Sequence, residues 1–449
     1  MIASTEKLQS WLQQFEQFDR PDRGPAWLRS RRREAFTRFW ELGFPTIHDE
    51  DWRFTSVQPI ANTAFQLAPA APDVLTTYPF DGAACQIVFV NGRFAVALSS
   101  VSALPSNVTV RSLADVLTSD GDEVEPHLAR HEDFKHDAFT ALNTAFIHDG
   151  AYVRIPRGVV LEQPIHILYI SAGADTPLMS HPRNLIVVDE NAQAEIVEDY
   201  VSLGSGTFFS NVVTELIVGE NSVVSHYMIE REDRQALNVS TLHIRQNRAA
   251  NVSSHSVLLG GALVRNNVHP VLAGEGGECL INGLFMGAGR QHMDNYMKVE
   301  HQAPHCGSRQ FYNGILDEHA RGVFHGRIIV HKGAQKTDAK QTNRNLLLSD
   351  DAQIDTKPQL EIYADDVKCT HGATIGQIDE SALFYLRSRG LPEADARALL
   401  LFAFANESLD RMKPGPVRHW LESLIAASLP QGATPRSGAA REITWQEVG

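Results

Sequence analysis

The sequence is poor in cysteine, the residue that builds disulfide frameworks and many closed zinc sites. Its 449 residues include only four cysteines, Cys85, Cys279, Cys306 and Cys369, and no two of them form a CxxC pair. This spacing excludes a disulfide-rich secreted fold and does not match a closed zinc site. Any cysteine chemistry must therefore use single thiols, and a metal site would need further ligands from a partner chain.

Long apolar runs, an excess of basic charge and nucleotide-binding motifs are also missing. No apolar run approaches the ~20 residues that span a bilayer, and the N-terminus lacks the basic-then-apolar order of a secretory signal, so a cytoplasmic location is predicted. Forty basic and 54 acidic residues give a formal net charge of −14, which argues against nucleic acid or a membrane surface as partner. The GxxxxGK[ST] and GxGxxG motifs are absent, so neither ATP hydrolysis nor standard dinucleotide binding is expected. The GxSxG nucleophile elbow of hydrolases is also absent.

Residues 1–146 are predicted to form a mainly helical domain that contains one hairpin. Apolar residues recur at helical spacing between Leu8 and Phe18, and again between Leu28 and Phe39. The stretch "CQIVFVNGRFAVAL" predicts a hairpin with Asn-Gly as its turn. We interpret a cluster of four arginines on the second helix as a solvated face: Arg29, Arg31, Arg32 and Arg33.

Residues 147–376 read as a series of short strands, each introduced by a polar turn and a small residue. The small residue recurs at a near-constant step, as from Ala320 to Ala334 and from Ala334 to Ala352, and elsewhere at about twice that step. Its other positions are Ala192, Ser222, Ala250, Gly277 and Val367. One strand-turn unit at near-constant spacing is typical of a β-solenoid. An antiparallel sandwich is the alternative, but it does not account for the recurring turn. We therefore predict a mainly β protein with a solenoid core.

Residues 377–449 are predicted to be a C-terminal helical domain. Asp379 is placed to cap one helix and Gly390 to end it, and Pro392 opens the next, "EADARALLLFAFANESLDRM". The second helix carries more apolar side chains than one buried stripe requires, which indicates a partner surface. These residues are Leu399, Leu400, Leu401, Phe402 and Phe404. The C-terminal segment, residues 430–449, is predicted to be a flexible tail.

Two features of residues 350–375 could carry chemistry. In "DDVKCTHGATI", Cys369 and His371 are two apart, so on a strand they share a face with Val367. Ordinary packing and metal ligation both remain open for this pair. The acidic doublets Asp350-Asp351 and Asp365-Asp366 are separated by one strand-turn unit. If that unit is one turn of the solenoid, the two doublets stack on each other. Stacked as carboxylates, they would suit a β-helical carbohydrate-active hydrolase or lyase, which is the alternative function.

Several long stretches resemble the SufD family, the scaffold subunits of the SUF iron–sulfur cluster assembly system. The resemblance lies in the segment from "EHQAPHC" at 300–306 to "VKCTHGAT" at 367–374, which is followed by "ALFYLRSRG". It extends to "DEDWRFTSVQP" near the N-terminus and to "LLLFAFANE". The sister SufB subunits share the solenoid but are richer in cysteine and have a different strand in place of "VKCTHGAT".

The resemblance implies a non-enzymatic scaffold with a right-handed parallel β-helix between helical domains. It implies an edge-to-edge heterodimer with SufB and binding of the SufC ATPase through the C-terminal helices, here Leu399, Leu400, Phe402 and Phe404. A homodimer in the absence of SufB is a further expectation. His371, with Cys369 beside it, matches the interface histidine implicated in transient assembly of an iron–sulfur cluster shared with SufB. The resemblance assigns no role to His301, His305 or Cys306, no iron donor and no flavin.

Overall fold

Parallel strands dominate the structure, a computed structural model that describes residues 2–20, 24–69, 80, 82–101, 104–130, 134–173 and 175–429. The chain divides into two compact units, Met1–Ile375 and Gly376–Gly449. The predicted tail, residues 430–449, and His131 lie outside the described residues. Among the described residues, no helix combines the length and the apolar character needed to cross a membrane.

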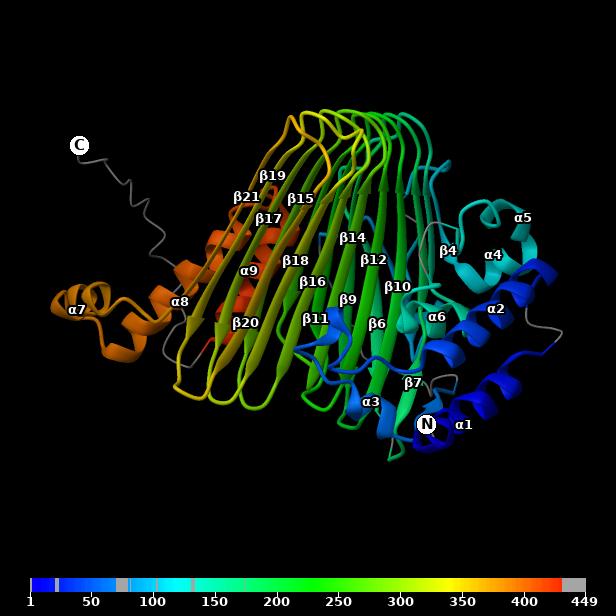
Figure 1. The fold of residues 1–449 in the computed structure, drawn as a ribbon, viewed down its shortest axis with the longest axis horizontal. Helices are drawn as coiled ribbons and strands as arrows, with labels where there is room; N and C mark the ends of the chain where they lie inside the picture. Colours follow the sequence, from blue (N-terminus) through cyan, green and yellow to red (C-terminus); the bar gives the residue numbers. More distant parts are fainter. Residues whose placement is uncertain are drawn as a thin grey trace. The chain divides into compact units, whose positions relative to one another are not determined.

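Two long sheets face each other in the first unit, and successive strands alternate between them (Figure 1). Sheet A follows the order β20 (Gln353–Ile362), β18 (Arg321–Val330), β16 (His292–His301), β14 (Leu263–Leu272), β12 (Leu237–Gln246), β10 (Phe208–Val218), β8 (Arg183–Val188), β5 (Ala151–Ile155) and β4 (Thr109–Ser112). In the same sheet β7 (Leu178–Ser180) pairs with β10, and β1 (Gln66–Leu67) pairs with β7. Sheet B follows the order β21 (Lys368–Gly376), β19 (Asp338–Leu347), β17 (Gly307–Leu316), β15 (Glu278–Gly287), β13 (Asn251–Leu258), β11 (Val223–Arg231), β9 (Gln193–Leu203), β6 (Ile165–Ala172), β2 (Cys85–Val90) and β3 (Arg93–Phe94).

This alternation makes a parallel β-solenoid in which one turn contributes one strand to each sheet. Val223 of β11 pairs with Asn251 of β13, and Asn251 pairs with Glu278 of β15, both in parallel register. Between each pair of partners the chain passes through one strand of sheet A, so paired residues are two strand-turn units apart. The predicted strand-turn unit is therefore half a turn. The predicted solenoid is confirmed, and the antiparallel sandwich is wrong.

One corner of the solenoid explains four of the recurring small residues, Ala192, Ser222, Ala250 and Gly277, each of which directly follows a residue with a left-handed backbone. A residue with a left-handed backbone occupies this corner once per turn, at Asn191, Asn221, Ala249, Gly276, His305 and Lys336, with φ between 54° and 71°. Its backbone N–H donates to a carbonyl one turn further along the chain, over 2.6 to 3.1 Å. The next residue, for example Ala192 or Ala250, turns into the core and has no exposed surface. Only small side chains fit there.

The inward-facing side chains of both sheets form one continuous core along the solenoid. Ile196, Met228, Phe285 and Phe324 belong to it, and each packs against its neighbours in adjacent turns. Because each turn buries the inner face of the next, only the first and last turns need other cover.

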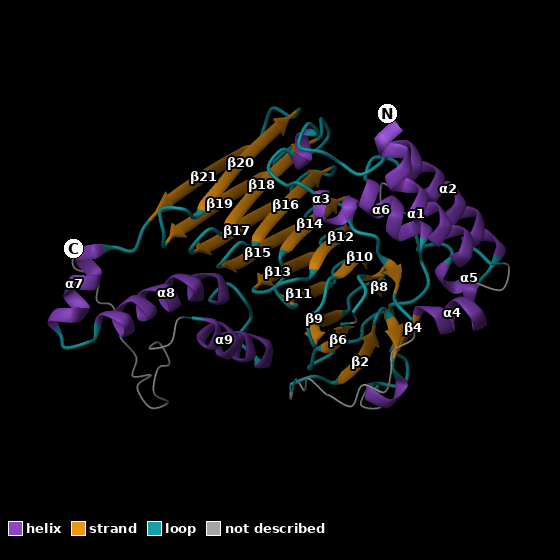
Figure 2. Ribbon diagram, turned by 90° about the horizontal axis from the view of Figure 1, so that it is seen from below, coloured by secondary structure: helices purple, strands orange, loops and turns teal. Residues whose placement is uncertain are grey.

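The N-terminal helices cover the outer face of sheet A over its early strands. They are α1 (Ile2–Phe18) and α2 (Ala26–Leu42), as the apolar spacing predicted, and α6 (Ala138–Ala145). The other short elements are η1 (Glu50–Trp52), α3 (Gln58–Asn62), η2 (Val96–Leu98), α4 (Leu113–Ser119) and α5 (Gly121–Val124). Trp11, Phe39 and Phe139 pack against Phe209 of β10 and Leu263 of β14. Figure 2 shows these helices gathered beside β8, β10 and β12, while β20 and β21 lie at the other end of the sheets.

The predicted hairpin is confirmed, but the predicted solvated arginine face is wrong for one of its members. Strands β2 and β3 pair antiparallel, and Asn91 and Gly92 have φ of 53° and 73°, as their tight turn requires. Arg32 is 1% exposed and donates through Nε to the carbonyl of Ile147 at 2.9 Å. Its guanidinium also lies 5.2 Å from the centre of the Phe18 ring. A paired guanidinium can be buried, and helical spacing alone does not reveal its partner.

A short segment, residues 49–55, crosses the outer face of sheet A and ties its last strands to the N-terminal region. We call it the cross-sheet segment. Glu50 accepts from Lys357 Nζ at 3.0 Å and from Gln359 Nε2 at 3.1 Å, both on β20. The Arg265 guanidinium on β14 lies 4.1 Å from the centre of the Trp52 ring. These contacts give a structural reason for the "DEDWRFTSVQP" motif.

The second unit contains three helices among its described residues: α7 (Glu380–Ser388), α8 (Glu393–Leu409) and α9 (Pro416–Ser428). The Asp379 carboxylate accepts from the backbone N–H of Ser381 at 2.8 Å, and Gly390 has φ of 93°. The predicted cap and the predicted helix end are therefore confirmed. Val417, Leu421 and Ile425 form the buried stripe of α9.

The left-handed corner predicts a stabilising substitution. Ala249→Gly should raise the free energy of unfolding by about 0.5–1 kcal/mol, because a β-carbon is unfavourable at positive φ. Chemical denaturation measures this change. The matched control is Ala250→Gly, next in the chain but buried with no exposed surface, which should destabilise. A loss of stability in Ala249→Gly would show that the corner does not strain alanine.

Candidate functional site: the open end of the solenoid

Strands β20 and β21 are the last strands of sheets A and B, and within the described residues each pairs with a neighbour on one side only, β18 and β19 respectively. The Lys368 backbone N–H donates to the carbonyl of Thr337 at 2.8 Å and aligns β21 on β19. Every residue of β21 except the partly buried Cys369 is exposed, whereas nearly every residue of β17 is buried. The outer edges of these two strands are therefore available for pairing with another chain.

Cys369 and His371 lie on the side of β21 that faces the solenoid core. Cys369 packs against that core together with Val367. Alternation along the strand puts His371 on the same side. His371 is nevertheless exposed, since it stands in the last turn. The structure thus places the Cys369 thiol and the His371 imidazole two residues apart on the same side of an uncovered strand.

The two side chains are an incomplete set of metal ligands. Burial raises the pKa of the Cys369 thiol, so the protonated form prevails in the isolated chain and metal binding would have to displace a proton. Among the described residues, no group of three or more His, Cys, Asp or Glu side chains could hold a metal ion. An iron–sulfur cluster takes four protein ligands, so a cluster at this surface would require donors from elsewhere.

The other histidine and cysteine residues of the central stretch have structural explanations. His301 is fully buried, with its Nε2 at 2.9 Å from Ser308 Oγ, and burial lowers its pKa to about 4. His305 is one of the left-handed corner residues, with φ of 59°. Cys306 is the small residue after that corner, and its thiol donates to the carbonyl of Gly274 at 3.3 Å. The recurring corner pattern in the sequence could have identified the roles of His305 and Cys306.

The predicted stacking of the acidic doublets is wrong. Asp350 and Asp351 precede the ten-residue strand β20 and Asp365 and Asp366 follow it, so the strand separates the doublets by about 30 Å. Asp351 pairs with His319 at 3.6 Å, and Asp366 pairs with Lys336. Glycosidic chemistry needs carboxylates about 5–10 Å apart. The error arose because one strand-turn unit is half a turn of the solenoid, not a full turn.

The C-terminal helices display part of the predicted apolar surplus. Leu399 is 43% exposed, and Leu400, Phe402 and Phe404 are partly buried; Leu401, by contrast, is 3% exposed and belongs to the interior of the helical unit. A second pair of exposed apolar residues, Phe384 (73%) and Tyr385 (57%) on α7, was not predicted from the sequence. The run "LFY" could have indicated this exposed pair, because only its leucine fits a buried stripe.

Comparisons with known proteins agree with this architecture. Residues 169–404 match the family described as "SUF system FeS cluster assembly, SufBD core domain", and residues 6–167 match the SufBD protein N-terminal region. The chain is 32% identical to the iron–sulfur cluster assembly protein SufD of Escherichia coli over 437 residues, 96% of this chain and 98% of that protein. It is 36% identical to an iron–sulfur cluster assembly SufBD family protein of Synechocystis over 397 residues, 86% of this chain and 87% of that protein.

The exposure of His371 predicts that its side chain contributes little to folding. His371→Ala should change the free energy of unfolding by less than about 0.5 kcal/mol, as surface substitutions do. His301→Ala, the matched substitution inside the solenoid, should cost about 1–3 kcal/mol through the cavity that it leaves. Denaturant titration of both variants checks the contrast. A cavity-sized loss for His371→Ala would favour ordinary packing.

Proposed function

We propose a specific role for this chain within the family to which it belongs, the SufBD family of the SUF iron–sulfur cluster assembly system. The chain has a role in iron–sulfur cluster assembly, as its family and its likeness to SufD indicate. Within that system it is a scaffold without catalysis of its own. It pairs with a SufB subunit through β20 and β21, recruits a SufC ATPase through α7 and α8, and holds a nascent cluster transiently with SufB.

The open end of the solenoid supports the pairing with SufB. Unpaired strand edges favour association by strand addition, and an uncovered last turn needs apolar cover. Exposed apolar residues lie there: Ile362 (41%), Tyr363 (62%) and Ile375 (51%). SufB is the proposed partner, because the resemblance described above implies that SufB subunits share the solenoid. Two copies of this chain form a weaker version of the same contact when SufB is absent.

The single observation that carries the proposal is the incomplete donor pair on that same surface. Cys369 and His371 face the solenoid interior in the last turn, where a partner would cover them. A thiolate and an imidazole are suitable ligands for iron. The remaining ligands then come from the partner, so the cluster forms only between the two chains and is cargo of the complex.

The division of labour with an ATPase follows from the sequence and the second unit. The chain has no phosphate-binding loop, so nucleotide chemistry is assigned to SufC. Helices α7 and α8 expose Phe384, Tyr385 and Leu399. Exposed apolar groups of this kind are typical of a docking surface.

Cluster assembly tests the donor pair. In the complex with SufB and SufC, His371→Ala should abolish the visible absorption of a cluster formed anaerobically from iron and sulfide, because one ligand of a shared site is lost. Cys369→Ser should weaken it comparably if the thiol ligates, since a hydroxyl replaces thiolate poorly. His319→Ala, an exposed histidine on another turn, is the control. Normal assembly by a fully folded His371→Ala complex would contradict the proposed role.

ATPase recruitment tests the second surface. Leu399→Asp should lower SufC binding at least about tenfold, because a charge replaces an exposed apolar contact at the proposed interface. Ala394→Asp introduces the same charge into the first turn of α8 and should leave binding unchanged. Affinity is measured with the purified full-length chains, and circular dichroism confirms folding. A chain that ends at Gly390 keeps α7 but lacks α8 and should bind SufC much more weakly; unchanged binding would show that α8 is not part of the interface.

A further inference from the structure

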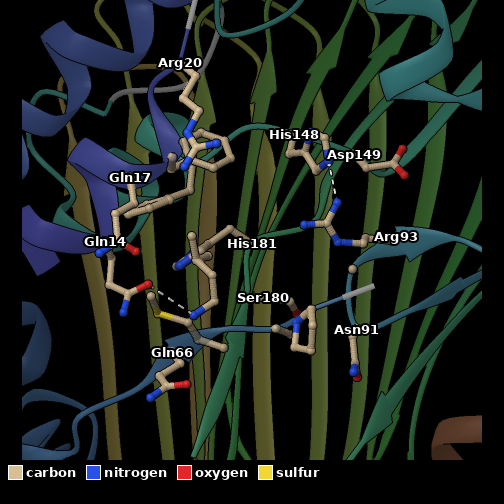
Figure 3. A pocket seen from close by; sticks show the side chains of 17 residues that line it. Gln14, Gln17, Arg20, Gln66, Asn91, Arg93, His148, Asp149, Ser180 and His181 are labelled. Atoms are coloured by element: carbon tan, nitrogen blue, oxygen red, sulfur yellow. Dashed lines mark hydrogen bonds between the residues drawn. The ribbon is translucent and has the colours of Figure 1, made fainter. Parts of the chain in front are cut away.

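A cavity of about 570 Å³ lies far along the chain from the open end, between helix α1 and the early turns of the solenoid. Its walls come from α1, from β1, from the turn between β2 and β3, from the segment after α6 and from β7. Figure 3 shows Gln14, Gln17 and Arg20 on one side, Arg93 and His148 on the other, and Ser180 and His181 between them. The volume is in the range of small-molecule sites, about 300–1,000 Å³.

The Asp149 carboxylate, one of the hydrogen-bond acceptors around this cavity, is already occupied by the protein. The Asp149 carboxylate accepts from Ser112 Oγ at 2.7 Å and from the backbone N–H groups of Phe94, Ala114 and Gly150. Its oxygens therefore support the wall and do not offer acceptors to a ligand, and Figure 3 shows the carboxylate turned away from the other labelled side chains.

Two more acceptors are occupied in the same way. The Asn91 carbonyl oxygen accepts from the Ala172 N–H at 2.8 Å. His148 Nε2 lies 3.0 Å from Arg93 Nη1 and accepts from it, since a guanidinium can only donate. The Asn91 amide NH2 and the guanidinium groups of Arg93 and Arg20 contribute donors to the lining of the cavity, and Arg93 already donates to His148.

His181 adds a buried donor without a partner. Its side chain is 6% exposed, and burial lowers its pKa to about 3, so the ring is neutral. The Asn211 amide NH2 lies 3.2 Å from His181 Nδ1, which makes Nδ1 the acceptor and leaves the proton on Nε2. Nε2 has no hydrogen-bond partner among the described residues. A buried N–H without an acceptor is costly, so a ligand that accepts from it would be stabilised.

An apolar surface completes the cavity. Phe18, Phe146 and Met179 line it and are each 4% exposed or less, and the His181 ring stacks on Phe146 with centroids 4.9 Å apart. Gly92 is required at the rim, because a β-carbon there would approach Ser180 Cβ to 2.9 Å. The cavity thus combines a planar apolar surface with donors, two of them cationic.

We propose that this cavity binds a small organic anion, whose carboxylate or phosphate group is held by Arg93, Arg20 and the His181 Nε2–H while its apolar body packs on Phe146 and Met179. The site is separate from the cluster surface and does not depend on the proposed assembly role. Carboxylate and phosphate share the chemistry that the donors recognise, and the experiment separates them.

Binding of two anions and one neutral analogue tests the site. Phenylacetate and phenyl phosphate offer a carboxylate and a phosphate on the same ring, and phenylacetamide lacks the charge. At least one anion should raise the melting temperature of the full-length protein at millimolar concentration and bind at least about tenfold more tightly than phenylacetamide in calorimetry. Whichever anion binds more tightly identifies the acid group.

Substitutions locate the binding. Arg93→Met should weaken it at least about tenfold by removing a charged donor. Because Arg93 also contacts His148, Arg20→Met, a change on an exposed side chain, provides a second variant that should weaken binding without affecting folding. Arg157→Met, a surface arginine outside the cavity, should bind as the unchanged protein does. Binding of neither anion, equal binding of phenylacetamide, or unchanged affinity in both cavity variants would each overturn the proposal.

Discussion

In-register stacking of successive turns is the constraint on which the structure depends. Each turn donates backbone hydrogen bonds to the next through the strands and through the left-handed corner, as when the Asn221 N–H donates to the Arg248 carbonyl at 3.0 Å. Each turn also buries the inner face of its neighbour. A stack of this kind has no natural stopping point, because any last turn has a free edge and an uncovered interior. Whether each end of the solenoid is closed or left open therefore determines where another chain can pair with it.

The first end of the solenoid is closed by antiparallel strands, whereas the last end is open. At the first, short antiparallel strands stop the parallel stacking: β3 pairs with β2, and β4 with β5. At the last, no such strand follows β20 or β21 within the described residues, and the cross-sheet segment holds β20 only by its outer face, through Glu50. The fold thus protects one end against further pairing and keeps the other aligned but open. This asymmetry is what an assembly surface requires.

The sequence predicted what repeats and missed what depends on contacts between distant residues. The strand-turn unit, the Asn-Gly hairpin and the Asp379 cap are local patterns, and each was found in the expected place. The length of the strand-turn unit did not reveal whether it was a full turn or half of one, and this ambiguity produced the wrong stacking of the acidic doublets. The burial of Arg32 depends on the carbonyl of Ile147, which is distant in the sequence. No local pattern carries such information, nor does any predict the cavity beneath α1.

The position of the donor pair follows from the same stacking. Burial raises the pKa of the Cys85 and Cys279 thiols to about 12, so thiols inside the stack stay protonated and unreactive at neutral pH. Cys369 also faces inward, but it lies in the last turn and is only partly buried. A partner that covered this end would bring its own charges and ligands to a thiol that the isolated chain leaves protonated. Reactivity would then depend on the complex, because Cys369 lies in the turn that such a partner would cover.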